Sequence, residues 1–380
     1  MQFIRKIKHA FGVIICLTGT AFLCQGQDFD SKVSNEVFQD VKVRYHYGLV
    51  VPHHSYMTYF INDFSRGVEV NYGYINYGDD GWQKWYNFPE VGLSFFYNSF
   101  GNPDIYGQGM ALYPYINFNI LRRSRLNISH RVSLGLGYAN KPFNLEDNVY
   151  NRIFGTHLNV FIGFGLQFNY RIHPKWGITS AVALNHMSNG SSRKPNHGIN
   201  TMTASLGVSY QFNEQPWKTY QKEKAPRENG RDVVAVLSMG RSQGSVDNPT
   251  IYTSGSLNLT HLWHRSAKTA WGAGVDLIYF GAAPFAYIEE VERYDKSDGY
   301  QGGVFAAYEV YMGRTSIFMN VGAYVYHQIS TPQPVYPRLG IRHQVTNNIL
   351  ANFSIKASFF KAEFIEFGLG YRWNYKKNQR

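Results

Sequence analysis

Residues 157–171, HLNVFIGFGLQFNYR, decide the fold. Their odd positions are mostly polar residues or glycine, whereas their even positions are all apolar or aromatic: Leu158, Val160, Ile162, Phe164, Leu166, Phe168 and Tyr170. Successive side chains of a β-strand point to opposite faces, so this alternation predicts a strand with one apolar and one polar face.

The same alternation recurs along the chain, in residues 132–138, 271–279, 317–325, 349–359 and 365–375. A soluble sandwich also alternates, but its water-facing side usually carries many charges. Here the polar positions hold mainly Gly, Ser, Thr and Asn, which suits the lumen of a barrel. The chain also contains 29 tyrosines and 27 phenylalanines, as the aromatic girdles of membrane barrels require. We therefore predict an all-β protein, a transmembrane antiparallel β-barrel of about 14–16 strands.

The clearest internal boundary is a polar segment at residues 215–230. It separates an N-terminal half, residues 27–214, from a C-terminal half, residues 231–380. Since a closed barrel leaves no free edge on which a second half could dock, the sequence favours one large barrel. The alternative is an eight-stranded barrel followed by a second β half. Strands are hardest to place around residues 77–89, a connection longer than the short turns expected at that end of the barrel.

The N-terminus has the layout of an export signal. Arg5, Lys6 and Lys8 precede an apolar run at residues 10–23, which is too short to span a bilayer as a helix. Small side chains around Gly26 then fit cleavage after that residue. We expect residues 1–26 to be a signal peptide and the mature chain to reach the outer membrane.

Both cysteines, Cys16 and Cys24, fall within this signal. A lipoprotein acylated at Cys24 is the alternative, although Leu23 occupies a position that needs a small residue. Without cysteine, the mature chain has no disulfide and no thiolate metal site. The net charge of +11 comes from singly scattered basic residues, which argues against nucleic-acid binding. No phosphate-binding loop is present, and neither a cofactor nor a metal site is predicted.

Two neighbouring segments carry polar residues where the alternation calls for apolar ones. In residues 176–188 the apolar positions are Trp176, Ile178, Val182 and Leu184, and the same face continues with His186 and Ser188. In the following strand the apolar face begins at Met202, and Asn200 precedes it on that face. We therefore expect His186, Ser188 and Asn200 to point outward, toward lipid, near the outer end of one hairpin.

These three residue types suit acyl transfer. Ser188 would attack an ester carbonyl, His186 would take its proton, and Asn200 would hold the imidazole tautomer. Asn189 and the backbone of Gly190 would then supply an oxyanion hole. The alternative is that His186 and Ser188 simply lie at a strand end in the headgroup zone, where polar residues cost little.

The motif His186-Met187-Ser188-Asn189-Gly190, followed by KPNHGIN at residues 194–200, resembles the active-site signature of the PagL-type lipid A deacylases. That family is an outer-membrane barrel. This chain more closely resembles longer relatives, which are described as acyloxyacyl hydrolases. The resemblance implies that His186 is the base, Ser188 the nucleophile and Asn189 part of the oxyanion hole.

The chain departs from that family in two ways. The third catalytic member is a Glu in the family, and Asn200 occupies its position here. Asn can orient a histidine but cannot stabilise an imidazolium with a full charge. The family is also typically an eight-stranded barrel, and this chain is about twice as long as such a barrel requires.

The outward-facing residues and this resemblance together predict an outer-membrane carboxylic ester hydrolase. It would remove an acyl chain from lipid A, the anchor of lipopolysaccharide, or from a related glycolipid. Acyl chains would lie along the wall beside Leu184, Met202 and Ala204, and Arg193 and Lys194 would meet the anionic headgroup. The alternative is a non-catalytic barrel, either a pore or a structural protein, for which a lumen lined by Gly, Ser and Asn is also suitable.

Overall fold

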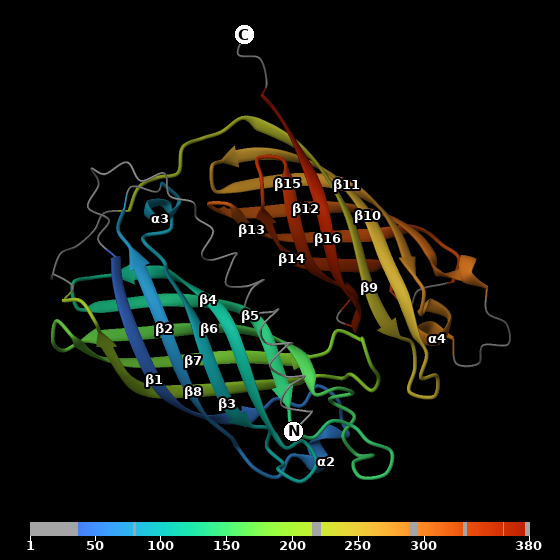
Figure 1. Ribbon diagram of the computed structural model, residues 1–380, viewed down its shortest axis with the longest axis horizontal. Helices are drawn as coiled ribbons and strands as arrows, with labels where there is room; N and C mark the ends of the chain where they lie inside the picture. Colours follow the sequence, from blue (N-terminus) through green and yellow to red (C-terminus); the bar gives the residue numbers. More distant parts are fainter. Residues whose placement is uncertain are drawn as a thin grey trace, which may run out of the picture. The chain divides into compact units, whose positions relative to one another are not determined.

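The computed structural model describes residues 37–78, 81–214, 222–288, 295–329, 333–359 and 361–376. Within them, the chain forms two closed antiparallel β-barrels of eight strands each (Figure 1). The predicted signal peptide at residues 1–26 and the first part of the polar connection, residues 215–221, lie outside the described residues. No helix in the described ranges is long and apolar enough to cross a membrane.

The first barrel contains strands β1 to β8, each paired with its neighbours in sequence, and β8 pairs with β1 to close the sheet. Its elements are β1 (Val37–Val50), α2 (Met57–Phe60), β2 (Ser65–Asn76), α3 (Gly81–Trp85), β3 (Glu90–Ser99), β4 (Gln108–Arg122), β5 (Leu126–Ala139), β6 (Leu158–Arg171), β7 (Trp176–Ser188) and β8 (Ile199–Gln211).

The second barrel contains β9 to β16 and closes through the pairing of β16 with β9. Its elements are β9 (Gly230–Gln243), β10 (Ile251–Ser266), β11 (Thr269–Phe280), α4 (Ala283–Tyr287), η1 (Lys296–Gly299), β12 (Tyr300–Met312), β13 (Thr315–His327), β14 (Val335–Gln344), β15 (Ile349–Ser358) and β16 (Lys361–Lys376).

The predicted fold class, an all-β antiparallel barrel with about this number of strands, is confirmed. The preference for one large barrel is wrong, because each half has the eight strands needed to close on itself. Neither barrel leaves a free strand edge, because the last strand of each half pairs with the first strand of the same half.

The alternation read from the sequence is the alternation of wall and lumen. In β6, Leu158 and Phe164 are 56% and 47% exposed on the outer wall, whereas Asn159 and Phe161 are buried in the lumen. In β16, Leu369 is 67% exposed and Glu366 is fully buried. Both barrels therefore present an apolar outer surface and a polar interior, as a lipid-facing barrel does.

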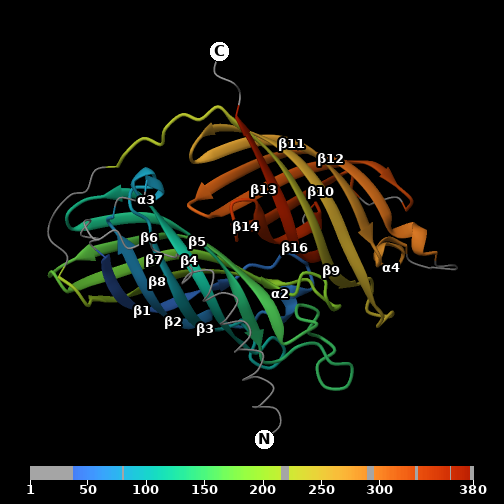
Figure 2. The ribbon, with the colours of Figure 1, turned by 45° about the horizontal axis from the view of Figure 1, so that its top comes forward.

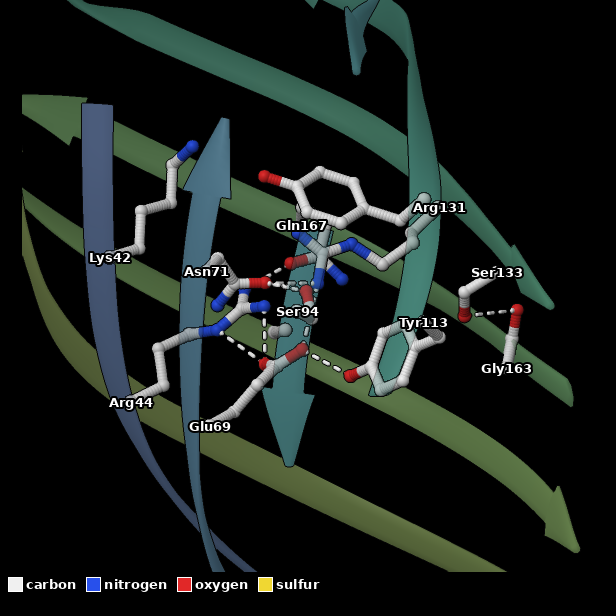
Figure 3. Close-up of polar contacts among 12 residues, drawn as sticks. Lys42, Arg44, Glu69, Asn71, Ser94, Tyr113, Arg131, Ser133, Gly163 and Gln167 are labelled. Carbon is white, nitrogen blue, oxygen red and sulfur yellow. Dashed lines mark hydrogen bonds and ion pairs between the residues drawn. The ribbon is translucent and has the colours of Figure 1, made fainter. Parts of the chain in front are cut away.

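Buried ion pairs fill the lumen of the first barrel. Glu69 on β2 receives Arg44 from β1 at 2.6 Å and Arg131 from β5 at 2.9 Å (Figure 3). Arg44 also donates to Gln167 on β6, across the barrel. Buried charges are tolerated only when they are paired and hydrogen-bonded in this way.

The second barrel has a lumen of the same kind. Glu309 is paired with Arg342 at 2.8 Å and with Arg372 at 2.6 Å. Farther along the lumen, Arg338 bridges Asp276 at 2.7 Å and Glu366 at 2.8 Å. The polar face of the strands therefore packs as a solid core of charges and amides in both barrels.

The two ends of the first barrel differ. Short turns at residues 123–125 and 172–175 lie at one end, together with α3, which accounts for the long connection at residues 77–89. The longer connections at residues 140–157 and 189–198 gather with α2 at the other end (Figure 2). A cluster of buried apolar residues, here called the apolar cap, packs at that end: Val50, Met57, Phe100, Tyr106, Ala139, Ile153, Phe154, Met187 and Ile199.

Candidate active site

The candidate site lies where β7 ends and β8 begins. His186 and Asn200 are directly opposite each other in the antiparallel ladder between these strands. They share their face with Leu184 and Met202, which are 47% and 49% exposed on the outer wall. The site therefore belongs to the outside of the barrel, near the end that carries the longer loops.

A chain of hydrogen bonds joins the three predicted residues. His186 Nε2 lies 2.9 Å from Ser188 Oγ, and His186 Nδ1 lies 2.8 Å from Asn200 Oδ1. Because an amide oxygen can only accept, this contact places the proton of a neutral imidazole on Nδ1. The Nε2 lone pair is then free to accept the Ser188 hydroxyl proton, which is the arrangement that a serine nucleophile and its base require.

The apolar cap holds both strands of the site from behind. Met187 lies between His186 and Ser188 in sequence and points into the cap, and Ile199 does the same beside Asn200. Both are almost completely buried. Side chains locked in packing of this kind keep the outward-facing neighbours in register, which a catalytic group needs.

Gly198 fits tightly against the Ser–His pair. Its φ of +72° is in the left-handed region, and a Cβ atom there would lie 2.8 Å from His186 Cε1 and 3.0 Å from Ser188 Cβ. Its N–H donates to the carbonyl of Ile153 at 3.1 Å, so the β5–β6 loop holds this glycine in place. Only glycine suits both the backbone conformation and the space.

The predicted oxyanion residues differ in which donors are available. The Asn189 backbone N–H donates to Asn196 Oδ1 at 2.9 Å, and its side-chain amide donates to Thr156 and to the carbonyl of Arg193. The backbone and side-chain N–H groups of Asn189 therefore already have acceptors, and they hold the loop together. The Gly190 N–H, two residues after Ser188, has no acceptor among the described residues.

The two predicted headgroup cations lie in the same loop. Arg193 is exposed, and Lys194 is partly buried with Nζ 3.0 Å from Ser191 Oγ. Both follow Ser188 within six residues, so they border the site on its loop side.

One histidine that the sequence did not indicate, His53, contacts the site, and His54 and His197 lie beside it. His53, from the β1–β2 loop, places Nδ1 3.2 Å from Asn200 Nδ2 and Nε2 2.9 Å from the carbonyl oxygen of His197. His197 Nδ1 in turn lies 3.0 Å from His54 Nε2. Desolvation among the loops, with His54 and Lys194 nearby, lowers the pKa of His197 to about 4.

Nothing in the spacing could have revealed this contact, because more than 140 residues separate His53 from His197. A pair of adjacent histidines in a loop, such as His53 and His54, is by itself only a weak indication of a metal site. In the parts of the chain that the structure describes, no group of three or more His, Cys, Asp or Glu side chains could hold a metal ion.

Fold and site together define an antiparallel β-barrel that carries a hydrogen-bonded serine–histidine pair on its outer wall. Two family models match the chain. The model described as lipid A 3-O-deacylase (PagL) matches residues 66–209, and the model described as acyloxyacyl hydrolase, C-terminal domain, matches residues 231–375. Each barrel of the chain therefore matches one model of the PagL-type family of lipid A deacylases and acyloxyacyl hydrolases.

Among solved structures, the outer membrane enzyme PagL matches at 13% identity with a TM-score of 0.34, over 44% of this chain and 97% of its own. A triple mutant of the Rhodopseudomonas blastica porin matches at 7% identity and a TM-score of 0.18, over 89% and 100%. The Acinetobacter baumannii outer membrane protein Omp33 matches at 8% and 0.18, over 89% and 99%. Likenesses this low add nothing to the family assignment. No curated protein matches the chain.

Proposed function

We propose that this protein is an outer-membrane esterase that removes an acyl chain from lipid A or a related acylated glycolipid. The observation that carries the proposal is the hydrogen-bond chain from Ser188 through His186 to Asn200, on the outer wall of a barrel in a deacylase family. Localisation rests on the apolar walls of the barrels and on the signal peptide expected at residues 1–26.

The outward position of the site suits a substrate that never leaves the membrane. Leu184, Met202 and Ala204 form an exposed apolar surface directly below the pair on the same face. Acyl chains in the outer leaflet would lie along this surface and bring the ester to Ser188. Arg193 and Lys194, in the loop above, would meet the anionic headgroup.

The chemistry is acyl transfer through a covalent intermediate. Ser188 Oγ attacks the ester carbonyl while His186 Nε2 takes its proton, and the Gly190 N–H donates to the oxyanion that forms. His186 then gives the proton to the leaving alkoxide, which departs as the alcohol of the glycolipid. A water molecule, deprotonated by His186, hydrolyses the acyl–serine ester and releases the fatty acid.

Asn200, the third residue of the site, performs only one of the two tasks that an acidic residue would perform there. It fixes the proton of His186 on Nδ1 but carries no charge to stabilise the imidazolium that forms during attack. We therefore expect slower turnover than an acidic residue would give at this position.

We further propose that the two barrels are the two domains of the chain, residues 27–214 and 231–380, joined by residues 215–230. The deacylase site belongs to the first. A pore is not favoured for either barrel, since buried ion pairs such as Glu69 with Arg44 and Glu309 with Arg372 fill their lumens. Planar-bilayer recordings should accordingly find no steady conductance.

The test is mass spectrometry of lipid A from a Gram-negative host that expresses the wild-type protein or Ser188→Ala. We expect the wild type to remove one acyl chain, and Ser188→Ala to leave lipid A intact because the nucleophile is missing. The effect on turnover should be at least about 10³-fold, as for other serine hydrolases that lose their nucleophile.

Ser180→Ala is the matched control, because Ser180 lies on the same strand and the same face, eight residues before Ser188. It should deacylate like the wild type. Deacylation that persists undiminished in Ser188→Ala would refute the mechanism. Intact lipid A with the correctly folded wild type would refute lipid A as the substrate.

A further inference from the structure

His53 reaches the site from the neighbouring strand, because β1 pairs with β8 where the sheet closes. It follows β1 in the β1–β2 loop, and that loop is tied to the site by the hydrogen bond from Val51 N to the carbonyl of Asn200, 2.8 Å. The imidazole has two contacts, one through each nitrogen: Nε2 with the carbonyl oxygen of His197 at 2.9 Å and Nδ1 with Asn200 Nδ2 at 3.2 Å.

These contacts fix the proton of His53. A backbone carbonyl oxygen can only accept, so His53 Nε2 must carry the proton that points at His197. A neutral imidazole has one N–H, so Nδ1 is a lone pair and can only accept. The group that faces it from Asn200 must therefore be the side-chain NH2.

The orientation of the Asn200 amide follows, and with it the tautomer of His186. With NH2 toward His53, the amide oxygen faces His186 Nδ1 and accepts its proton, as the 2.8 Å contact requires. If the amide were turned over, its NH2 would donate to Nδ1 and the proton of His186 would move to Nε2. That tautomer has no lone pair for the Ser188 hydroxyl and cannot act as the base.

We infer that His53 is a positioning residue, which acts through the amide of Asn200 to keep His186 in the tautomer that serves Ser188. This inference rests on the proposed function. It applies to a site with Asn in the third position, because an amide has a donor side and an acceptor side. A carboxylate accepts on both oxygens and would hold His186 Nδ1–H without a second partner.

The test is a double-mutant cycle with His53→Ala and Asn200→Glu, assayed on purified lipid A in detergent micelles. His53→Ala should lower kcat by about tenfold with little change in KM, the size expected for one lost neutral hydrogen bond. In the Asn200→Glu background the same substitution should change kcat by no more than about twofold, the limit of ordinary additivity error.

His54→Ala is the matched control. His54 is the neighbouring exposed imidazole of the same loop and contacts His197, but it makes no hydrogen bond to Asn200. It should leave kcat near the wild-type value in both backgrounds. An equal loss from His53→Ala in both backgrounds would mean that His53 only supports the loop, and no loss in either would mean that the amide needs no partner. Both results overturn the inference.

A spectroscopic measurement separates this inference from the proposed function. In ¹⁵N-histidine-labelled protein, the ring nitrogen shifts of His186 should report the Nδ1–H tautomer in the wild type and a mixture of tautomers in His53→Ala. If the wild type fails to deacylate, the proposed function is refuted. The ring nitrogen shifts still show whether His53 sets the tautomer of His186. An unchanged, pure Nδ1–H tautomer in His53→Ala overturns the inference whatever the activity.

Discussion

The two barrels of this chain are built alike and differ where the seventh strand of each one ends. In the first barrel, β7 ends in Asn185-His186-Met187-Ser188. The outward-facing positions there are His186, which is half-buried, and Ser188, which is 6% exposed. In the second, β15 ends in Ile355-Lys356-Ala357-Ser358. Lys356 and Ser358 are buried on the lumen side, and the outward position between them is Ala357.

The difference shows how few residues distinguish a barrel with a candidate site from one without. Both barrels have eight strands, apolar walls and lumens filled with ion pairs. Within the described strands, only the first barrel has a hydroxyl and an imidazole two residues apart on the outward face. Because side chains alternate along a strand, a shift of one position turns a serine from the membrane to the lumen. Fold and family therefore cover both barrels, whereas the site belongs to one.

The feature that the barrels share, a lumen of buried ion pairs, should give the largest effect on stability. Glu69→Gln leaves Arg44 and Arg131 without their shared carboxylate, and Glu309→Gln does the same to Arg342 and Arg372. Breaking a buried pair by removing one partner costs about 3–5 kcal/mol. We expect losses of that order in the free energy of unfolding, measured by urea titration in lipid vesicles with tryptophan fluorescence.

Glu214→Gln provides the control, since Glu214 lies 3.7 Å from Lys175 in an exposed pair. Surface pairs of this kind contribute about 0–1 kcal/mol. If Glu69→Gln or Glu309→Gln cost no more than Glu214→Gln, the lumens would be hydrated and the barrels would not be the solid cores described above.

The feature that separates the barrels, the site at the end of β7, should be sensitive to a single methyl group. Gly198→Ala would place a Cβ atom 2.8 Å from His186 Cε1, and the backbone there cannot relax because φ is +72°. A displacement of the pair by about 1 Å costs about 10²-fold in rate. We expect kcat for lipid A to fall by that factor while the protein still folds.

Gly107→Ala imposes the same backbone strain at a distance from the pair. Gly107 has a φ of +70° in the β3–β4 loop, where a Cβ atom would meet Asn140 and Lys141. This variant should lose stability but keep its kcat. Equal losses of kcat in both variants would show that loop strain, and not contact with His186, accounts for the effect.

The sequence predicted a residue's environment best where that environment depends only on the residue's own strand. The alternation in residues 157–171 was sufficient to assign wall and lumen, and the continuation of that parity predicted the outward face of His186 and Asn200. It failed where distant segments meet. Closure of two barrels depends on which strands pair, and eight alternating strands look the same whether they close alone or with eight more.

The same limit applies inside the barrels and around the site. Arg44, Glu69 and Arg131 lie in three different strands, and only the closed sheet brings them together. His53 could not be predicted for the same reason. Its contact with Asn200 joins the loop after the first strand of the barrel to the last strand. The roles of His186, Ser188 and Asn200 stay predictions that the proposed experiments test.

The charges at the site and in the lumen also differ, and this contrast predicts the smallest effect. Lumen cations such as Arg44 face carboxylates, whereas the groups that act on His197 are His54, Lys194, His53 and Arg152, all of them basic. Desolvation and these neighbours lower the pKa of His197 to about 4, so the folded loop favours the neutral imidazole. The unfolded loop takes up its proton near the ordinary value of about 6.5. The stability of the loop is therefore complete above about pH 6.5 and is lost progressively as the pH falls toward 4.

Amide hydrogen exchange of residues 189–198, corrected for its intrinsic pH dependence, should rise several-fold across that window. In His197→Gln, which keeps a polar partner for His54 but does not titrate, the rise should flatten. The ion-paired strands of the lumen, such as β2 and β5, should show no matching change, because Glu69 of β2 and Arg131 of β5 are buried partners of each other. An unaltered rise in His197→Gln would mean that another group loosens this loop. The contrast between a charge-paired interior and an unpaired basic rim would then no longer explain how the site responds to pH.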